Sequence, residues 1–291
     1  MKPIVEFLLW DNCNNHCKFC FLKEHNSCPS FLTDVEKLGS ISSVIKYIDS
    51  TKFERGSSVL LCGGELFDSQ LSPEAYRAFE ELMNLLVFRM QDKTIDQLYV
   101  NTNLIYDMNL LLHPFLTVLD SYGLLDRLHF TTSFDLVGRY KNAEDKQLFL
   151  NNIKEIKKTF PNLHIIANMV MTNYLCMLVL DDNIDIKELE DSMGVEINLI
   201  PYIILHEDLA PTNEMVMETI TRVYGYGDSL KRYISKFSTN IPRVLLKYHN
   251  NNLVEMTSDI SGCGHSANFQ LYSKTGNCFI CDLLKLEGDN K

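Results

Sequence analysis

The chain has 291 residues, with 27 Lys or Arg against 38 Asp or Glu, so its formal net charge is −11. Its 46% hydrophobic and 22% charged residues are typical of a folded protein and exclude a collagen-like, disordered or low-complexity chain. The acidic balance argues against a protein that binds phosphate backbones in general, so we do not expect a nucleic-acid partner.

Short apolar runs alternate with amphipathic helical patterns over the first 205 residues. The apolar runs predict six strands, at 5–10, 59–61, 98–100, 128–134, 163–171 and 195–203. Apolar residues at helical spacing predict helices at 33–49, 73–90, 108–121, 144–159 and 185–193. This alternation predicts parallel strands with right-handed crossovers, in a sheet that is either doubly wound or wholly or partly closed into a barrel. Functional residues are then expected at the carboxyl ends of the strands.

The pattern changes after residue 203. Helices are expected at 212–224 and 229–237, and a hairpin with cysteines at its rim at 269–280. We therefore expect a boundary near residue 205, with 206–291 forming a C-terminal extension and not another strand–helix unit. The N-terminal apolar run lacks a cleavage site and no run of 18 apolar residues occurs, so we expect neither a signal peptide nor a membrane span, and a cytoplasmic protein.

Three of the nine cysteines form a tight cluster directly after the first predicted strand. Cys13, Cys17 and Cys20 have the spacing Cys-x3-Cys-x2-Cys in a run rich in Asn. Three thiolates this close suit three irons of a 4Fe-4S cluster and leave the fourth iron open to a small molecule. A zinc knuckle completed by His16 or Cys28 is the alternative.

A second motif follows the second predicted strand. There Gly63, Gly64 and Glu65 come directly after Cys62, where two glycines allow close approach of the backbone to a ligand and the carboxylate can accept from an ammonium group. The cysteine cluster and this Gly-Gly-Glu, each after the expected strand, together resemble the radical S-adenosylmethionine (SAM) enzymes. In that family the residue before the last cysteine is usually aromatic, as Phe19 is here.

Weaker matches extend the resemblance along about 200 residues. Asn103 stands in a Thr-Asn pair after the third strand, although Leu104 replaces the Gly that the family usually has next. Ser133 and Asp135 follow the fourth strand, again without the family's next Gly. Residues 149–153 are similar to a helix of the peptide-modifying branch.

The resemblance implies both a fold and an activity. The fold is an α/β partial (β/α)6 barrel with a small cysteine-containing extension. The activity is reductive cleavage of SAM at a 4Fe-4S cluster to a 5′-deoxyadenosyl radical that abstracts a substrate hydrogen, with an electron donor such as flavodoxin or ferredoxin. SAM would be bound by residues of the four strand ends: Phe19, Gly63, Gly64, Glu65, Asn103 and Ser133. Asp135 is a candidate base after hydrogen abstraction, with orientation of SAM as its alternative role.

The remaining concentration of cysteines lies near the C-terminus. Cys263, Cys278 and Cys281 bracket the predicted hairpin and indicate a second metal site, either a second iron–sulfur cluster or zinc. The pattern resembles the SPASM and twitch extensions of peptide maturases, which makes a peptide or protein side chain the expected substrate. The fourth ligand is left open among four side chains: His265, Cys28, Cys62 and Cys176. A viperin-like enzyme acting on a small molecule or nucleotide, and a non-catalytic iron–sulfur or zinc module, are the alternatives.

Overall fold

Strands and helices alternate in the computed structural model, which describes residues 2–15, 17–20, 32–67, 71–201, 207–225, 229, 232–233, 243–249 and 252–255. The second cysteine group (Cys263, Cys278, Cys281), the predicted hairpin at 269–280 and Cys28 lie outside the described residues. Within these ranges no helix is both long and apolar enough to cross a membrane.

The strands are β1 (Ile4–Leu8), β2 (Ser57–Cys62), β3 (Ile95–Thr102), β4 (Leu128–Ser133), β5 (Ile165–Met171), β6 (Glu196–Pro201), β7 (Arg243–His249) and β8 (Asn252–Glu255). The helices are α2 (Asp34–Ile48), α3 (Pro73–Gln91), α4 (Leu112–Ser121), α5 (Ala143–Thr159), α6 (Asn173–Leu180), α7 (Ile186–Met193) and α8 (Asn213–Tyr224), with 3-10 turns η1 (Leu125–Arg127) and η2 (Glu207–Leu209).

Local signals account for where several helices begin. Thr33 caps α2 and forms a reciprocal capping box with Glu36, and Pro73 occupies the first turn of α3 behind the N-cap Ser72. Helix α6 was not predicted, because its apolar sequence carries no amphipathic period. It begins at the N-cap Thr172, whose side chain accepts a hydrogen bond from the backbone of Leu175.

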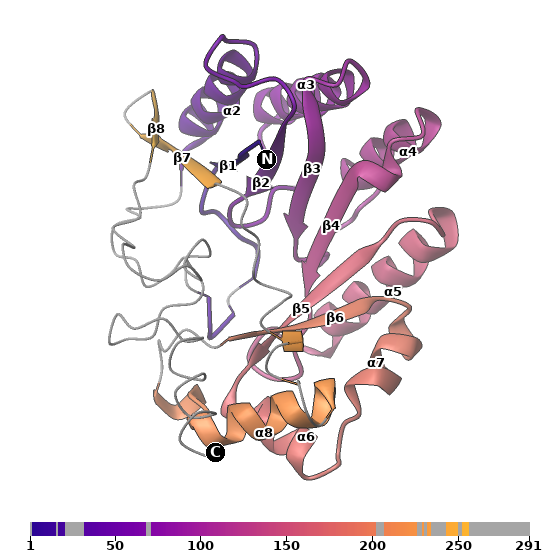
Figure 1. The fold of residues 1–291 in the computed structure, drawn as a ribbon. Coiled ribbons are helices and arrows are strands. Elements are labelled where there is room, and N and C mark those ends of the chain that lie inside the picture. The colour runs from indigo at the N-terminus through magenta and orange to yellow at the C-terminus, as the bar shows by residue number, and fades with distance from the viewer. Residues whose placement is uncertain are drawn as a thin grey trace.

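The sheet has the order β6-β5-β4-β3-β2-β1-β7-β8, and all neighbours are parallel except β7 and β8. The predicted α/β class is confirmed. From β1 to β6 the strands follow one another without the reversal of order that marks a doubly wound sheet. In Figure 1 the helices from α2 round to α8 follow one side of the curved sheet. This arrangement is compatible with a partial barrel.

Strand β7 differs from the expectation for the C-terminal extension. No strand was predicted at 243–249, yet Arg243–Lys247 pair in parallel with Ile4–Leu8 of β1. Since β7 follows α8, it adds one more helix-then-strand step to the same sheet. The apolar run is short and has a charged residue at each end, so its sequence did not predict a strand. Its pairing with β1 depends on contacts between residues far apart in sequence, which no local pattern specifies. The boundary near residue 205 stays a prediction.

The two faces of the sheet differ in burial. On β5 the residues Ile165, Ala167, Met169 and Met171 are fully buried in the hydrophobic core, while Ile166, Asn168 and Val170 between them are half-buried. Strands β2 and β4 alternate in the same way. One face therefore packs against the helices, and the opposite face carries the less buried, more polar side chains.

Candidate functional site

The residues predicted to follow the first four strands lie at one edge of the sheet. Leu8 at the end of β1 is in register with Cys62 at the end of β2, and Thr102 of β3 is in register with Thr132 of β4. Because these strands are parallel, the segments that follow them leave the sheet at the same edge. The cysteine loop, the Gly-Gly-Glu segment and the polar ends of β3 and β4 are therefore neighbours.

The two glycines after β2 lie directly against the cysteine loop. A Cβ atom on Gly64 would be 1.9 Å from the backbone oxygen of Asn12, and one on Gly63 would be 2.4 Å from that of Trp10. Two hydrogen bonds join the segments: Gly64 N–H donates to Trp10 O at 2.8 Å, and Glu65 N–H donates to Asn12 O at 2.8 Å. In this structure the space that side chains would need is filled by the chain itself, so the glycines position the cysteine loop.

The Glu65 carboxylate is buried, with only 2% of the residue exposed. One of its oxygens accepts hydrogen bonds from the Thr102 hydroxyl at 2.9 Å and from the backbone of Phe67 at 3.1 Å. The other accepts from the backbone N–H of Asn103 at 2.5 Å. Glu65 thus joins the end of β2 to the end of β3 and fixes Asn103, a structural role that the sequence did not indicate.

Polar groups surround two of the three clustered sulfurs. Cys13 Sγ accepts from the backbone N–H of Asn15 at 3.4 Å and from Asn103 Nδ2 at 3.6 Å, and Cys17 Sγ accepts from Asn15 Nδ2 at 3.4 Å. Burial, the largest effect, raises the pKa of the Cys13 thiol to about 11. This thiol is therefore protonated at neutral pH, and a metal ion that binds it must displace the proton.

The donor set fits a soft metal in its chemistry. Cys13, Cys17 and Cys20 are half-buried thiols on one loop, in no disulfide with any described residue, and Phe19 is half-buried beside Cys20. Proteins that hold iron–sulfur clusters also donate N–H hydrogen bonds to the sulfur atoms of the cysteine ligands. In the described part of the chain, however, no group of three or more His, Cys, Asp or Glu side chains is close enough to hold a metal ion. The structure thus brings Cys13 and Cys17 together around Asn15 without gathering all three sulfurs.

Ser133 and Asp135 lie where β4 leaves the sheet. Ser133 is half-buried and in register with Asn168 of β5. Asp135 is buried; its Oδ1 accepts from the backbone of Val137 at 2.9 Å, while its Oδ2 has no hydrogen-bond partner among the described residues. Burial raises the pKa of Asp135 to about 6, against the smaller opposing effects of backbone hydrogen bonds and of Arg139. A carboxyl group of this kind can take up or release a proton near neutral pH.

The loop between β4 and α5 contributes residues that sequence reasoning missed. Arg139 Nη1 donates to Cys17 Sγ at 3.8 Å, the backbone N–H of Lys18 donates to Gly138 O at 2.9 Å, and Lys141 donates to the backbone oxygen of Asn14. Both basic residues lie in the segment between a predicted strand and a predicted helix, where basic side chains are usually solvated. Their position alone therefore did not indicate a role at the cysteine loop.

A row of polar side chains crosses the half-buried face at the same edge of the sheet. Ser133, Asn168 and Asn198 are successive register partners on β4, β5 and β6. Asn198 Nδ2 donates to Asn168 Oδ1 at 3.4 Å, and Asn198 Oδ1 is buried with no partner in the part of the chain that the structure describes. No site residue was predicted on β5 or β6. Each of these strands carries one Asn among apolar residues, and that polar side chain within an apolar strand was the signal that could have identified the pair.

Two cysteines proposed as alternative ligands lie on separate elements. Cys62, the last residue of β2, is half-buried, and its thiol donates to the Glu6 carboxylate at 3.3 Å. Cys176 is fully buried within α6. Their predicted part in the second metal site stays a prediction, because Cys263, Cys278 and Cys281 lie outside the described residues.

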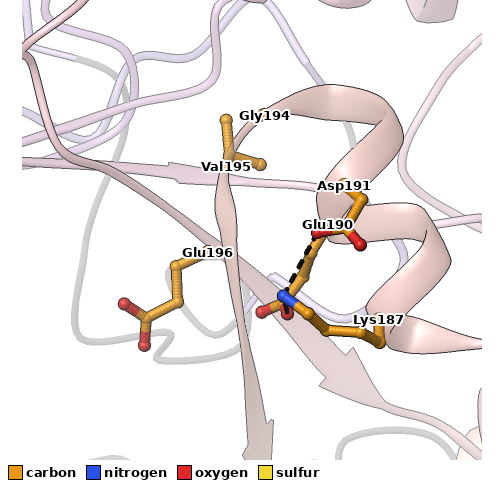
Figure 2. A pocket seen from close by; sticks show the side chains of 6 residues that line it. All are labelled: Lys187, Glu190, Asp191, Gly194, Val195 and Glu196. Atoms are coloured by element: carbon orange, nitrogen blue, oxygen red, sulfur yellow. Dashed lines mark hydrogen bonds and ion pairs between the residues drawn. The ribbon is translucent and has the colours of Figure 1, made fainter.

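A hollow of about 400 Å³ lies between α7 and the beginning of β6 (Figure 2). Its lining includes Lys187, which is within 3.3 Å of Glu190 and within 3.2 Å of Asp191. Glu196, the first residue of β6, also lines it, so the hollow is at the amino edge of the sheet and the cysteine loop is at the carboxyl edge. We interpret it as a solvated surface ion cluster, separate from the candidate site.

Comparison with known proteins leaves the family of this chain open, because no family model and no curated protein matches it.

Proposed function

We propose that this chain is a radical SAM enzyme with a partial (β/α)6 barrel. The observation that carries the proposal is the direct contact between the cysteine loop after β1 and the Gly-Gly-Glu segment after β2. Both motifs stand at the carboxyl ends of neighbouring parallel strands, where α/β proteins of this topology carry their active sites.

The residues have distinct roles in this proposal. Cys13, Cys17 and Cys20 hold a 4Fe-4S cluster, and Asn15 and Asn103 direct N–H groups at two of the sulfurs. When bound, that cluster supplies the electron for reductive cleavage of SAM to methionine and a 5′-deoxyadenosyl radical.

The SAM molecule would lie across the polar edge of the sheet. Gly63, Gly64 and Glu65 order the segment that meets its methionine part, and Ser133 presents a hydroxyl from β4. Phe19 contributes an apolar surface beside the last cysteine. Asp135, whose pKa of about 6 suits proton transfer near neutral pH, is the candidate base after hydrogen abstraction.

The substrate class follows from the C-terminal cysteines. We propose a peptide or protein side chain as the substrate, with a flavodoxin or ferredoxin as electron donor and a second iron–sulfur cluster or zinc ion on Cys263, Cys278 and Cys281. The part of the proposal that concerns substrate rests on sequence pattern alone.

Formation of 5′-deoxyadenosine tests the activity directly. Anaerobically reconstituted protein should carry at least four irons per chain and should release 5′-deoxyadenosine when given SAM and dithionite. Cys13→Ala should abolish the product because it removes an iron ligand. Met177→Ala, an exposed sulfur-containing side chain on α6 that belongs to neither cysteine group, is the control and should retain it. An intact cluster without any 5′-deoxyadenosine would contradict the proposal and favour a non-catalytic iron–sulfur module.

A further inference from the structure

The loop between β4 and α5 contacts the cysteine loop through three hydrogen bonds. Gly138 accepts from the backbone of Lys18, Arg139 donates to the Cys17 sulfur, and Lys141 donates to the backbone oxygen of Asn14. Two of these three contacts come from basic side chains, those of Arg139 and Lys141. The cysteine loop of this acidic protein is therefore approached from the β4 side by positive charge.

Arg139 is the buried member of the pair. Only 5% of the residue is exposed, and its Nε has no hydrogen-bond partner among the described residues. A guanidinium group stays charged in proteins, and burying it is costly unless an anion lies nearby. The Asp135 carboxyl interacts with it electrostatically, and the guanidinium carbon lies 5.9 Å from the centre of the Tyr140 ring. Its Nη1 donates to the Cys17 sulfur at 3.8 Å, so negative charge on that sulfur would further offset the burial of this cation.

We propose that Arg139 is a positioning residue that donates an N–H···S hydrogen bond to the metal-bound Cys17 thiolate and raises the reduction potential of the cluster. This inference rests on the proposed function. Reduction adds one electron, and therefore one negative charge, to the cluster, while Arg139 keeps its proton. A fixed buried cation and a hydrogen bond to ligand sulfur both favour the more negative, reduced state.

The midpoint potential of the reconstituted full-length protein, measured without SAM, tests the inference. The couple is titrated with dithionite and followed by electron paramagnetic resonance, and the iron content is measured on the same samples. At a fixed potential we expect Arg139→Gln to lower the ratio of reduced to oxidised cluster about tenfold, which is 59 mV for a one-electron couple. Arg139→Lys keeps the charge and loses the planar fork, so its shift should have the same sign and be smaller.

Lys141→Gln is the matched control, because it removes a cation that touches the cysteine loop through a backbone oxygen and not through sulfur. Its exposed position predicts a much smaller shift, since solvent and salt screen exposed charges. An unchanged potential in Arg139→Gln would overturn the inference, as would an equal shift in Lys141→Gln. Should Arg139→Gln fail to hold iron, an unchanged potential in Arg139→Lys overturns it.

The two proposals fail in different ways. If the wild-type protein holds no four-iron cluster on Cys13, Cys17 and Cys20, the proposed function fails and the inference fails with it. If every variant carries wild-type iron at the wild-type potential, the role of Arg139 is wrong and the proposed function stands.

Discussion

At the scale of single residues, Asp135 shows how burial sets chemistry. Its pKa in the folded protein is about 6, above the usual value of 3.8, and the largest cause is desolvation. A raised pKa means that the folded state favours the protonated form. The resulting stability is fully present below pH 3.8 and is lost as the pH rises through about 6.

Asp135→Asn should therefore change how stability depends on pH. We expect the free energy of unfolding of the wild type to fall relative to the variant between pH 4 and pH 6, by on the order of 2–3 kcal/mol, and the difference to level off above pH 7. Urea unfolding at a series of pH values measures it. A difference that stays constant from pH 4 to pH 7 would show that the carboxyl group ionises normally in the fold.

The sequence was sufficient to identify some site residues and not others. Cys13, Cys17 and Glu65 could be picked out because each belongs to a motif with a defined spacing and lies after a predicted strand. Arg139 and Asn198 could not, because their importance comes from neighbours supplied by distant segments: a cysteine sulfur 122 residues away in one case and a β5 amide in the other. Residue type and spacing predict a role only where the partners are also close in sequence.

At the scale of elements, the close contact between the segments that follow β1 and β2 requires a residue without a side chain at position 64. A Cβ on Gly64 would lie 1.9 Å from Asn12 O and 2.7 Å from Asp11 O, and backbone atoms cannot turn aside as the end of a side chain can. Gly64→Ala must therefore push the cysteine loop away from β2. We expect it to lower the free energy of unfolding by roughly 1–3 kcal/mol and to reduce the iron retained per chain.

Gly123→Ala is the control for that experiment. Gly123 has a φ of +63°, and a Cβ there would meet nothing within 4 Å. The variant should cost roughly 1 kcal/mol of backbone strain and should leave the iron content unchanged. Equal iron retention in Gly64→Ala and Gly123→Ala would contradict the idea that the glycine positions the cysteine loop.

At the scale of the whole molecule, the six alternating strands were predictable and the seventh was not. Hydrophobic periodicity and strand–helix alternation predicted the parallel arrangement of β1 to β6, because each crossover links neighbours that follow one another in sequence. Strand β7 joins the sheet on the far side of β1, and no local pattern specifies that neighbour. It also brings Tyr248 against helix α2, where a Cβ on Gly39 would lie 2.0 Å from the tyrosine oxygen.

This contact predicts that β7 and helix α2 fold as one cooperative unit. In the wild type, Gly39→Ala should destabilise the protein by roughly 1–3 kcal/mol, because the buried Tyr248 ring must move. In a Tyr248→Ala background the same change should stabilise it by up to about 1 kcal/mol, because Ala is the better helix former. Urea unfolding of the wild type, the two single variants and the double variant gives the coupling free energy between positions 39 and 248. Val35→Ala changes an exposed residue of α2, and its effect on stability should be additive with that of Tyr248→Ala. Additive effects of Gly39→Ala and Tyr248→Ala would mean that β7 unfolds independently of α2, whereas a reversal of sign would place β7 within the same folding unit as α2.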